Sequence, residues 1–442
     1  DVYVEPGYEA IDNYDGDLTS KVVVTGSVDT TKAGKYILTY SVIDSDGNTV
    51  NVTREITVEN LAKVTGIKVS SRSTTSLTLT WTKQSGVTGY QVYRYDTTSK
   101  SFKLVKTITG ADTNSYTASG LSAATAYKFK VRAYKTSGDS TYYGSNSDVI
   151  DAVTSPSQIK NVKISSRNAT SLKLAWTKQS GVTGYQVYRY DSKSKGYKQI
   201  KTISGANTNS YTASGLSAAT AYKFKVRAYK TAGGSTYYGT YSSVLDTVTA
   251  PLQVKNVRVS SRNTTSLKVT WTKQSRVTGY QIYQYNPTSK SYKLVKTVKG
   301  ATANSYTASK LSAGTTYKFK VRAYKTAGNN SYYGSYSSIL TTTTKPVTVN
   351  LTSVASNSSK SMTLKWKKAQ ASTGYQIQYS TSNKFSSSTT KNVTITNKNT
   401  VSKTVKGLVK GKKYFVKVRA FKTLSGTKYY GSWSNVKSVK VK

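Results

Sequence analysis

The chain contains no cysteine and no histidine, and only one methionine and five prolines among its 442 residues. The absence of cysteine excludes a disulfide framework, a cysteine-ligated zinc site and thiol catalysis. The absence of histidine removes the side chain that enzymes use most often as a general acid or base. No run of 18 apolar residues occurs, so we expect no membrane-spanning helix.

Acidic residues are scarce and unevenly placed. The chain has 65 Lys and Arg against 18 Asp and Glu, a formal net charge of +47. Residues 1–60 hold 11 acidic and 4 basic residues, a net charge of −7. The four stretches 61–155, 156–250, 251–345 and 346–442 carry net charges of +7, +12, +16 and +19. This asymmetry indicates anionic partners and says nothing about fold.

The scarcity of acids also restricts enzymatic chemistry. Without histidine, general acid–base catalysis needs a carboxylate pair in a pocket, and residues 251–442 contain no carboxylate side chain. The sequence shows no glycine-rich phosphate loop, no His/Cys metal-ligand spacing and no serine nucleophile elbow. We therefore predict a protein that is not an enzyme.

Four tryptophans recur 95 residues apart, at Trp81, Trp176, Trp271 and Trp366. The string WTKQSGVTGYQVYRY surrounds the first, returns unchanged around the second and returns with few changes around the third. A fixed period marks an array of equivalent units, and a unit of this length can bury its own core. We therefore predict five domains: 1–60, called the head below, and four repeats at 61–155, 156–250, 251–345 and 346–442.

Each repeat reads as an antiparallel β-sandwich. Short runs rich in β-branched and aromatic residues alternate with Gly, Ser, Thr and Asn, as at 76–81, 89–95 and 127–134. Period-2 alternation in short, evenly spaced strands is typical of sandwiches and barrels. No helical periodicity competes with it. The predicted fold class is all-β.

On these residues each repeat resembles a fibronectin type III domain. The resemblance rests on the second-strand tryptophan and on a Leu-x5-Tyr spacing, found at Leu121/Tyr127, Leu216/Tyr222, Leu311/Tyr317 and Leu408/Tyr414. It implies that this tyrosine forms the tyrosine corner of the sandwich, with its hydroxyl bonded back to the backbone. It implies a fold and says little about function.

The head is similar to a bacterial immunoglobulin-like domain common in multi-domain surface proteins. The similarity rests on Asp15-Gly16-Asp17-Leu18, Gly26, Gly34-x-Tyr36 and Asp44-x-x-Gly47-Asn48. It implies a further strand before the YVEPG stretch. We therefore expect that the chain is a piece of a longer protein or that another segment, or another protein chain, supplies this strand. The expected architecture is a linear array of one immunoglobulin-like and four fibronectin type III-like β-sandwich domains.

The head offers one metal hypothesis, and no other cofactor is expected. Asp12, Asp15 and Asp17 lie close together, and Asp44 and Asp46 lie in another predicted turn. Clustered hard oxygen ligands suit Ca²⁺, although the spacing is not that of an EF-hand. The alternative is that these side chains make the hydrogen bonds of tight turns.

Strand alternation predicts a face of tyrosine, lysine and arginine on every repeat. The predicted polyanion- or glycan-binding residues are Tyr93, Tyr95, Lys128, Lys130 and Arg132 in the first repeat, Tyr188, Tyr190, Lys223, Lys225 and Arg227 in the second, Tyr283, Tyr285, Lys318, Lys320 and Arg322 in the third, and Lys417 and Arg419 in the fourth. The alternative is an ordinary solvated strand face. The net charge of +54 over residues 61–442 favours binding, because it exceeds the magnitude of about 2–8 that keeps a small domain soluble.

A second aromatic motif, Tyr-Tyr-Gly, begins at Tyr142, Tyr237, Tyr332 and Tyr429. Adjacent strand residues face opposite sides, so one tyrosine of each pair is expected to be exposed. Exposed aromatic rings suit sugar or protein contacts. The alternative is that both rings pack around the loop and the joint between domains.

Together these features predict an extracellular bacterial cell-surface protein or stalk, in the cell wall or on its surface. Its basic repeats would adhere non-covalently to anionic cell-wall polymers or glycans by many weak contacts and display the N-terminal part. One alternative is the C-terminal accessory or binding region of a larger secreted hydrolase. The other is a nucleic-acid or sulfated-glycan binder. It is ranked last because the expected domains point to the cell exterior and the basic residues are spread over all repeats rather than concentrated on a known nucleic-acid motif.

Overall fold

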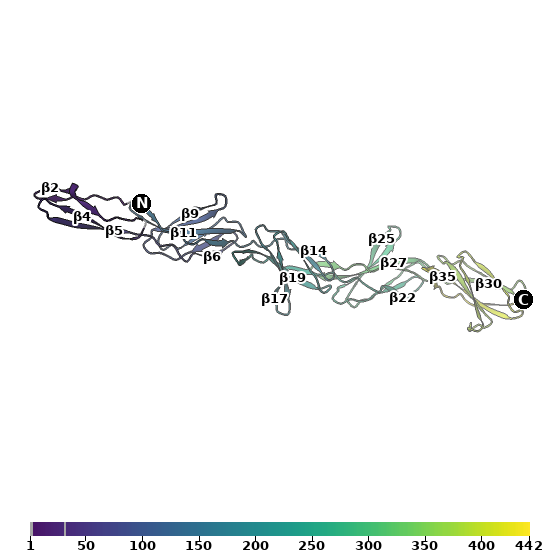
Figure 1. Ribbon diagram of the computed structural model, residues 1–442. Helices are drawn as coiled ribbons and strands as arrows, with labels where there is room; N and C mark the ends of the chain where they lie inside the picture. The colour runs from purple at the N-terminus through teal and green to yellow at the C-terminus, as the bar shows by residue number, and fades with distance from the viewer. Residues whose placement is uncertain (1–2, 31) are drawn as a thin grey trace.

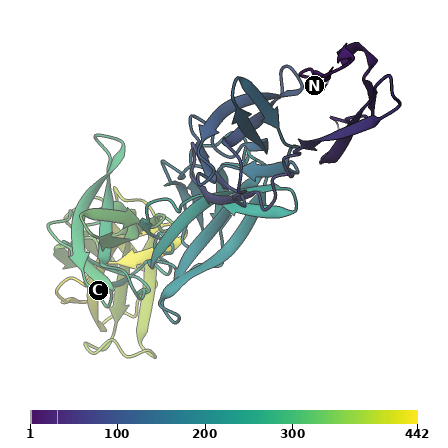
Figure 2. The same ribbon diagram turned by 90° about the vertical axis from the view of Figure 1, so that its left-hand side faces the viewer.

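The computed structural model describes residues 3–30 and 32–442, which form β domains that follow one another in a row (Figure 1). The turned view in Figure 2 shows the head standing apart from the repeats. Apart from one 3-10 turn, η1 (Thr19–Lys21), all regular elements of these residues are strands. The predicted all-β fold is therefore confirmed. Nothing in this described part forms a helix long and apolar enough to cross a membrane.

The head contains a short hairpin and a three-stranded antiparallel sheet. The sheet has the order β3-β4-β5, and its two long strands pair along their whole length. The hairpin consists of β1 (Ile11–Asp12) and β2 (Gly16–Asp17). The three-stranded sheet consists of β3 (Val23–Thr25), β4 (Gly34–Ile43) and β5 (Thr49–Val58). Residues 1–2 lie outside the described residues, and the strand expected before them stays a prediction.

The four repeats share one arrangement of eight strands. The first has β6 (Lys68–Arg72), β7 (Leu77–Thr80), β8 (Gly89–Asp96), β9 (Ser101–Thr109), β10 (Ser115–Ala118), β11 (Ala126–Ser137), β12 (Ser140–Tyr143) and β13 (Ile150–Val153). The second has β14 (Lys163–Arg167), β15 (Leu172–Ala175), β16 (Gly184–Asp191), β17 (Gly196–Ser204), β18 (Ser210–Ala213), β19 (Ala221–Ala232), β20 (Ser235–Tyr238) and β21 (Leu245–Val248). The third has β22 (Arg258–Arg262), β23 (Leu267–Thr270), β24 (Gly279–Asn286), β25 (Ser291–Lys299), β26 (Ser305–Ala308), β27 (Thr316–Ala327), β28 (Asn330–Tyr333) and β29 (Leu340–Thr343). The fourth has β30 (Leu351–Ala355), β31 (Ser361–Trp366), β32 (Gly374–Ser380), β33 (Thr390–Ile395), β34 (Ser402–Lys406), β35 (Lys413–Leu424), β36 (Thr427–Tyr430) and β37 (Lys437–Lys440).

Two sheets face each other in every repeat. In the first repeat the smaller sheet has the order β10-β7-β6, and the larger has β12-β11-β8-β9 with β13 also paired to β11. The predicted tyrosine corner is present: the amide of Ser122 donates to the hydroxyl of Tyr127 at 2.8 Å. The same bond recurs at Tyr222, Tyr317 and Tyr414, at 2.8, 2.8 and 3.3 Å.

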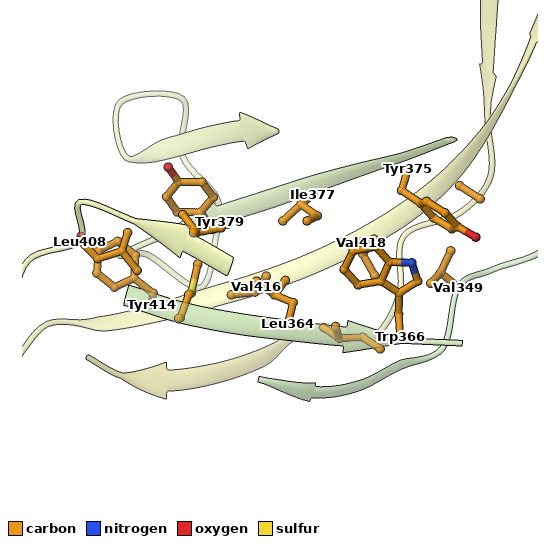
Figure 3. Close-up of a cluster of buried hydrophobic side chains, with 14 of the residues drawn as sticks. Val349, Leu364, Trp366, Tyr375, Ile377, Tyr379, Leu408, Tyr414, Val416 and Val418 are labelled. Carbon is orange, nitrogen blue, oxygen red and sulfur yellow. The ribbon is translucent and has the colours of Figure 1, made fainter. Parts of the chain in front are cut away.

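The core of each repeat is built around the repeating tryptophan. In the fourth repeat Trp366 lies in the layer between the sheets beside Tyr375, with ring centroids 5.4 Å apart (Figure 3). The corresponding pairs of the other repeats are 5.3–5.4 Å apart. All four tryptophans are only 3–4% exposed, so the repeating aromatic pair is structural.

A glycine begins the third strand of each repeat because a neighbouring backbone leaves no room for a side chain. A Cβ atom at Gly184 would lie 2.0 Å from the carbonyl oxygen of Ile203 and 3.0 Å from the ring of Tyr229. The ring of Tyr134 lies over Gly89 in the same way. Strand alternation places Tyr134 on the same side of its strand as Lys130 and Arg132. It does occupy the outer face, but it is only 7% exposed because it covers the glycine.

Candidate functional site

The candidate site is the outer face of the larger sheet of each repeat. β8 and β11 pair so that Tyr93 lies opposite Lys130 and Gln91 opposite Arg132. The second repeat places Tyr188 opposite Lys225. The third places Tyr283 opposite Lys320. Strand register therefore brings the predicted tyrosines and cations together.

The arginine of this face is held by groups of its own repeat. In the second repeat, Nε of Arg227 donates to Oε1 of Gln186 at 2.9 Å, and Nη2 donates to the hydroxyl of Tyr188 at 2.8 Å. The guanidinium carbon lies 3.9 Å from the ring centre of Tyr238 and 5.0 Å from that of Tyr241. A cation over an aromatic face is stabilised by about 0.5–2 kcal/mol, so this arginine already has partners.

The neighbouring lysine continues the stack. Nζ of Lys225 lies 3.6 Å from the ring centre of Tyr241 and 4.3 Å from that of Tyr197. Rings and cations thus alternate in the order Tyr238, Arg227, Tyr241, Lys225, Tyr197. We call this set, and its equivalents in the other repeats, the aromatic–cation ladder. Tyr188 lies beside it and is only 8% exposed, and burial raises its pKa.

The third repeat reproduces the ladder closely. Arg322 lies 4.0 Å from the ring centre of Tyr333 and 5.0 Å from that of Tyr336. Lys320 lies 3.7 Å from Tyr336 and 4.5 Å from Tyr292. The two repeats carry the same ladder residues, so the same contacts form in both.

The first and fourth repeats vary it. In the first repeat, Asn146 occupies the position of Tyr241, so the central ring is missing. Arg132 still lies 3.9 Å from the ring centre of Tyr143, and Lys130 lies 4.7 Å from that of Phe102. In the fourth, Trp433 takes the central position, 4.3 Å from Arg419 and 5.0 Å from Lys417. Burial lowers the pKa of both of these fourth-repeat cations.

The outermost predicted residues are less enclosed. Lys128 pairs with Asp151 at 3.6 Å and Lys223 with Asp246 at 3.4 Å, whereas Lys318 lies opposite Thr341 in the strand register. The predicted tyrosines here meet a second ring edge-on, with centroids 5.3–5.4 Å apart. These pairs are Tyr95–Phe102, Tyr190–Tyr197 and Tyr285–Tyr292.

Sequence reasoning missed the three aromatic rings of the ladder. Tyr238, Tyr241 and Tyr197 were not assigned to the face, nor were their equivalents. The available signal was the string YYG-x-Tyr, which reads YYGTY in the second repeat, YYGSY in the third and YYGSW in the fourth. The second tyrosine of the Tyr-Tyr-Gly motif covers the arginine of its own repeat.

The first tyrosine of that motif lies at the joint between repeats. The guanidinium carbon of Arg167, in the second repeat, lies 4.2 Å from the ring centre of Tyr332 in the third. The same contact joins Arg72 to Tyr237 at 4.3 Å and Arg262 to Tyr429 at 4.1 Å. The tyrosines therefore do pack at the joint, as one reading of the motif expected. We call this the Arg–Tyr joint.

The two ends of the repeat series lack this contact. The fourth repeat has Asn357 where the other three carry arginine. In the first repeat, Tyr142 is 45% exposed. Within the described residues, 3–30 and 32–442, the joint contact thus occurs at the three boundaries between repeats.

Other groups fix the same joints. The buried Thr154, at the end of the first repeat, donates its hydroxyl to the carbonyl of Ser122 in the same repeat at 2.6 Å and so holds the segment that leads into the joint. Ala124 of the first repeat belongs to the apolar core cluster of the second, and Ala219 of the second to that of the third. A Cβ atom on Gly181 would lie 3.1 Å from the carbonyl oxygen of Ala124. Neighbouring repeats therefore share packed surface.

The head carboxylates act mainly in turns. Oδ1 of Asp12 accepts from the amides of Tyr14 and Asp15 at 2.8 and 2.9 Å, and Asp17 accepts from the amide of Thr19 at 2.8 Å. These are the turn hydrogen bonds that were expected as the alternative to a Ca²⁺ site.

The second predicted loop behaves likewise. Asp44 accepts from the amides of Asp46 and Asn48, and Asp15 accepts from Ser45. Within residues 3–30 and 32–442, no three acidic side chains gather into a group that could hold a metal ion. The described residues therefore give the Ca²⁺ hypothesis no geometric support.

Comparison with known proteins agrees with this architecture. A family model described as "Bacterial surface protein, Ig-like domain" matches residues 1–58. A model described as "Fibronectin type III domain" matches residues 62–147, 155–244, 251–339 and 345–436.

Similar proteins include polysaccharide hydrolases. Exoglucanase B of Cellulomonas fimi is 31% identical over 340 residues, which cover 72% of this chain and 28% of that protein. Chitinase A1 of Niallia circulans is 34% identical over 190 residues, covering 40% of this chain and 25% of that protein. The chain spans about a quarter of the length of these relatives.

Among solved structures, a two-domain fibronectin type III segment of chicken tenascin is 21% identical. It covers 42% of this chain and 99% of its own, with a TM-score of 0.30. Both kinds of domain found here are non-catalytic. It belongs to the fibronectin type III family, with four such domains following a bacterial surface immunoglobulin-like domain.

Proposed function

We propose that this chain is an extracellular bacterial spacer. Its docked repeats hold the head away from a surface, and their positive charge associates with anionic cell-wall polymers or glycans. The observation that carries the spacer role is the Arg–Tyr joint, which recurs at all three boundaries between repeats at 4.1–4.3 Å. Domains that share packed surface at each boundary keep a preferred orientation, and this suits a stalk.

Association with anions is supported by charge balance. The third and fourth repeats contain 35 basic residues and no acidic side chain, so their lysines have no carboxylate within these repeats to pair with. The ladder cations are engaged with aromatic rings. Exposed cations on the smaller sheets are better placed to meet a polymer; they include Lys173, Lys268 and Lys365.

The extracellular location is supported by the bacterial-surface description of the domain that matches the head. A second candidate is the accessory region of a larger secreted hydrolase. The similarity to Exoglucanase B and Chitinase A1, of which this chain spans about a quarter, favours it. Both candidates assign the same physical task to these domains.

Sedimentation with purified bacterial cell walls tests the association. Walls with and without their anionic polymers are mixed with the whole chain across a salt series. Electrostatic association predicts retention that falls with salt, as the Debye length shortens from about 10 Å at 0.1 M to about 3 Å at 1 M, and that disappears from stripped walls. Equal retention on stripped walls at all salt concentrations would contradict it.

A further inference from the structure

We propose that the cleft at the joint between the second and third repeats binds a neutral polysaccharide chain. The proposal does not depend on the charge-based association above. The cleft has a volume of about 510 Å³ and is lined by both repeats. Ligand sites commonly have volumes of about 300–1,000 Å³ and often lie between domains.

Three half-buried tyrosines form its aromatic walls: Tyr190 and Tyr222 from the second repeat and Tyr332 from the third. Each ring is held in place by a separate contact. Tyr190 meets Tyr197 edge-on at 5.4 Å, Tyr222 accepts a bond from the Ser217 amide at 2.8 Å, and Tyr332 lies 4.2 Å from the guanidinium carbon of Arg167. Rings fixed in this way offer apolar faces without an ordering cost on binding.

The polar part of the cleft is an ion pair. Nζ of Lys223 lies 3.4 Å from the carboxylate of Asp246, and these side chains are 54% and 68% exposed. The pair presents a donor and an acceptor side by side with no net charge. Adjacent hydroxyls of a sugar ring match both groups, whereas an acidic sugar would meet the carboxylate of Asp246.

A saccharide fits the combination better than an anion or an apolar ligand. Sugar rings have C–H faces that pack on aromatic rings and hydroxyls that bond to a few placed polar groups. Asn330, the first residue of β28 in the third repeat, adds an amide to the lining.

The same residue types recur at the joint between the first and second repeats. The residues at the corresponding positions there are Tyr95, Tyr127 and Tyr237, and the corresponding ion pair is Lys128–Asp151 at 3.6 Å. At the joint between the third and fourth repeats the carboxylate is missing, because Thr341 stands in the position of Asp246. Two equivalent sites one repeat apart could engage one polymer and raise its overall affinity.

The test is calorimetric titration of the whole chain with a neutral β-1,4-linked glucose hexamer and, separately, an N-acetylglucosamine hexamer. Both titrations are run at about 1 M salt, where the Debye length is about 3 Å and association with polyanions is screened. Wild-type chain is expected to bind one of these hexamers with a stoichiometry of two. Tyr190→Ser should reduce the stoichiometry to one, and adding Tyr95→Ser should abolish binding.

Tyr285→Ser is the matched control. It removes the equivalent aromatic pair at the joint between the third and fourth repeats, where Thr341 stands in place of the aspartate. It should leave binding unchanged. Asp246→Ala, at an exposed position, should weaken binding at the joint between the second and third repeats without lowering the unfolding temperature. Failure of wild-type chain to bind either hexamer would overturn the proposal, as would an equal loss in Tyr285→Ser. Neither result would affect the salt-dependent retention on cell walls.

Discussion

Arg167 of the second repeat and Tyr332 of the third lie 4.2 Å apart, measured from the guanidinium carbon to the ring centre, and the contact crosses a domain boundary. The arginine is anchored in its own repeat, where Nη1 donates to the hydroxyl of Thr247 at 3.1 Å. Burial at this boundary lowers its pKa. A domain orientation fixed by one anchored cation can be tested by removing that cation.

Arg167→Ala should loosen the joint between the second and third repeats. A partly buried cation–π contact is worth about 1–2 kcal/mol, enough to shift the population of joint orientations several-fold. Residual dipolar couplings of the two repeats should then no longer fit one common orientation, and small-angle scattering should show a broader distance distribution. Arg258→Ala, an exposed position in the same repeat as Tyr332, is the control. Unchanged couplings in Arg167→Ala would contradict the assigned role.

Asn146→Tyr should stabilise the first repeat. The first repeat lacks the central ring of the aromatic–cation ladder but keeps Arg132 and Lys130 in place. Restoring the ring should add about 0.5–1 kcal/mol to the free energy of unfolding. Urea denaturation followed through the methyl signals of Val131 measures it. Asn146→Ala is the control, and an equal effect in both variants would argue against the ladder.

Gly184→Ala should destabilise the second repeat by at least about 1–3 kcal/mol, the usual cost of overpacking. The new methyl group would lie 2.0 Å from a backbone carbonyl oxygen that cannot move aside alone. Gly196→Ala is the control, since its nearest atom would be 3.6 Å away. Urea denaturation followed through Val187 methyl signals distinguishes them. Comparable losses in the two variants would be inconsistent with this packing.

The head should lose stability at alkaline pH. Burial, with a 2.7 Å hydrogen bond to Glu5, raises the pKa of Tyr40 from 10.0 to about 12. Between these values the unfolded chain releases the phenol proton and the folded head retains it. This contribution is therefore complete below pH 10 and is lost as the pH rises to about 12.

Urea titrations at several pH values, followed through the methyl signals of Leu38, measure this loss. Tyr40→Phe should remove the pH dependence in that window. Tyr14→Phe should not, because Tyr14 is 93% exposed. A pH profile that is the same in wild type and Tyr40→Phe would refute the assignment.

The sequence predicted the parts of the fold that depend on local pattern. Alternation along 127–134 located β11 and placed Lys128, Lys130 and Arg132 on one face. The Leu-x5-Tyr spacing located the corner at Tyr127. These predictions succeed because period-2 burial and short side-chain-to-backbone bonds are decided within a few residues.

The partners of the cations could not be predicted in this way. Tyr241 reaches Lys225 only because the chain after β20 returns across the sheet. Arg167 meets Tyr332 only once two domains dock. Both contacts join residues far apart in the chain, so neither periodicity nor composition reports them. Whether the face binds a polymer stays a prediction.

The Arg–Tyr joint gives every repeat a direction. At each boundary the arginine of one repeat contacts the tyrosine of the next repeat. The second and third repeats each contribute a tyrosine to the preceding boundary and an arginine to the following one, so they are interchangeable units. Duplication or loss of such a unit by recombination between near-identical gene segments would preserve every remaining joint. The reach of the array can therefore change in whole-domain steps during evolution, whereas the fourth repeat carries Asn357 in place of the arginine.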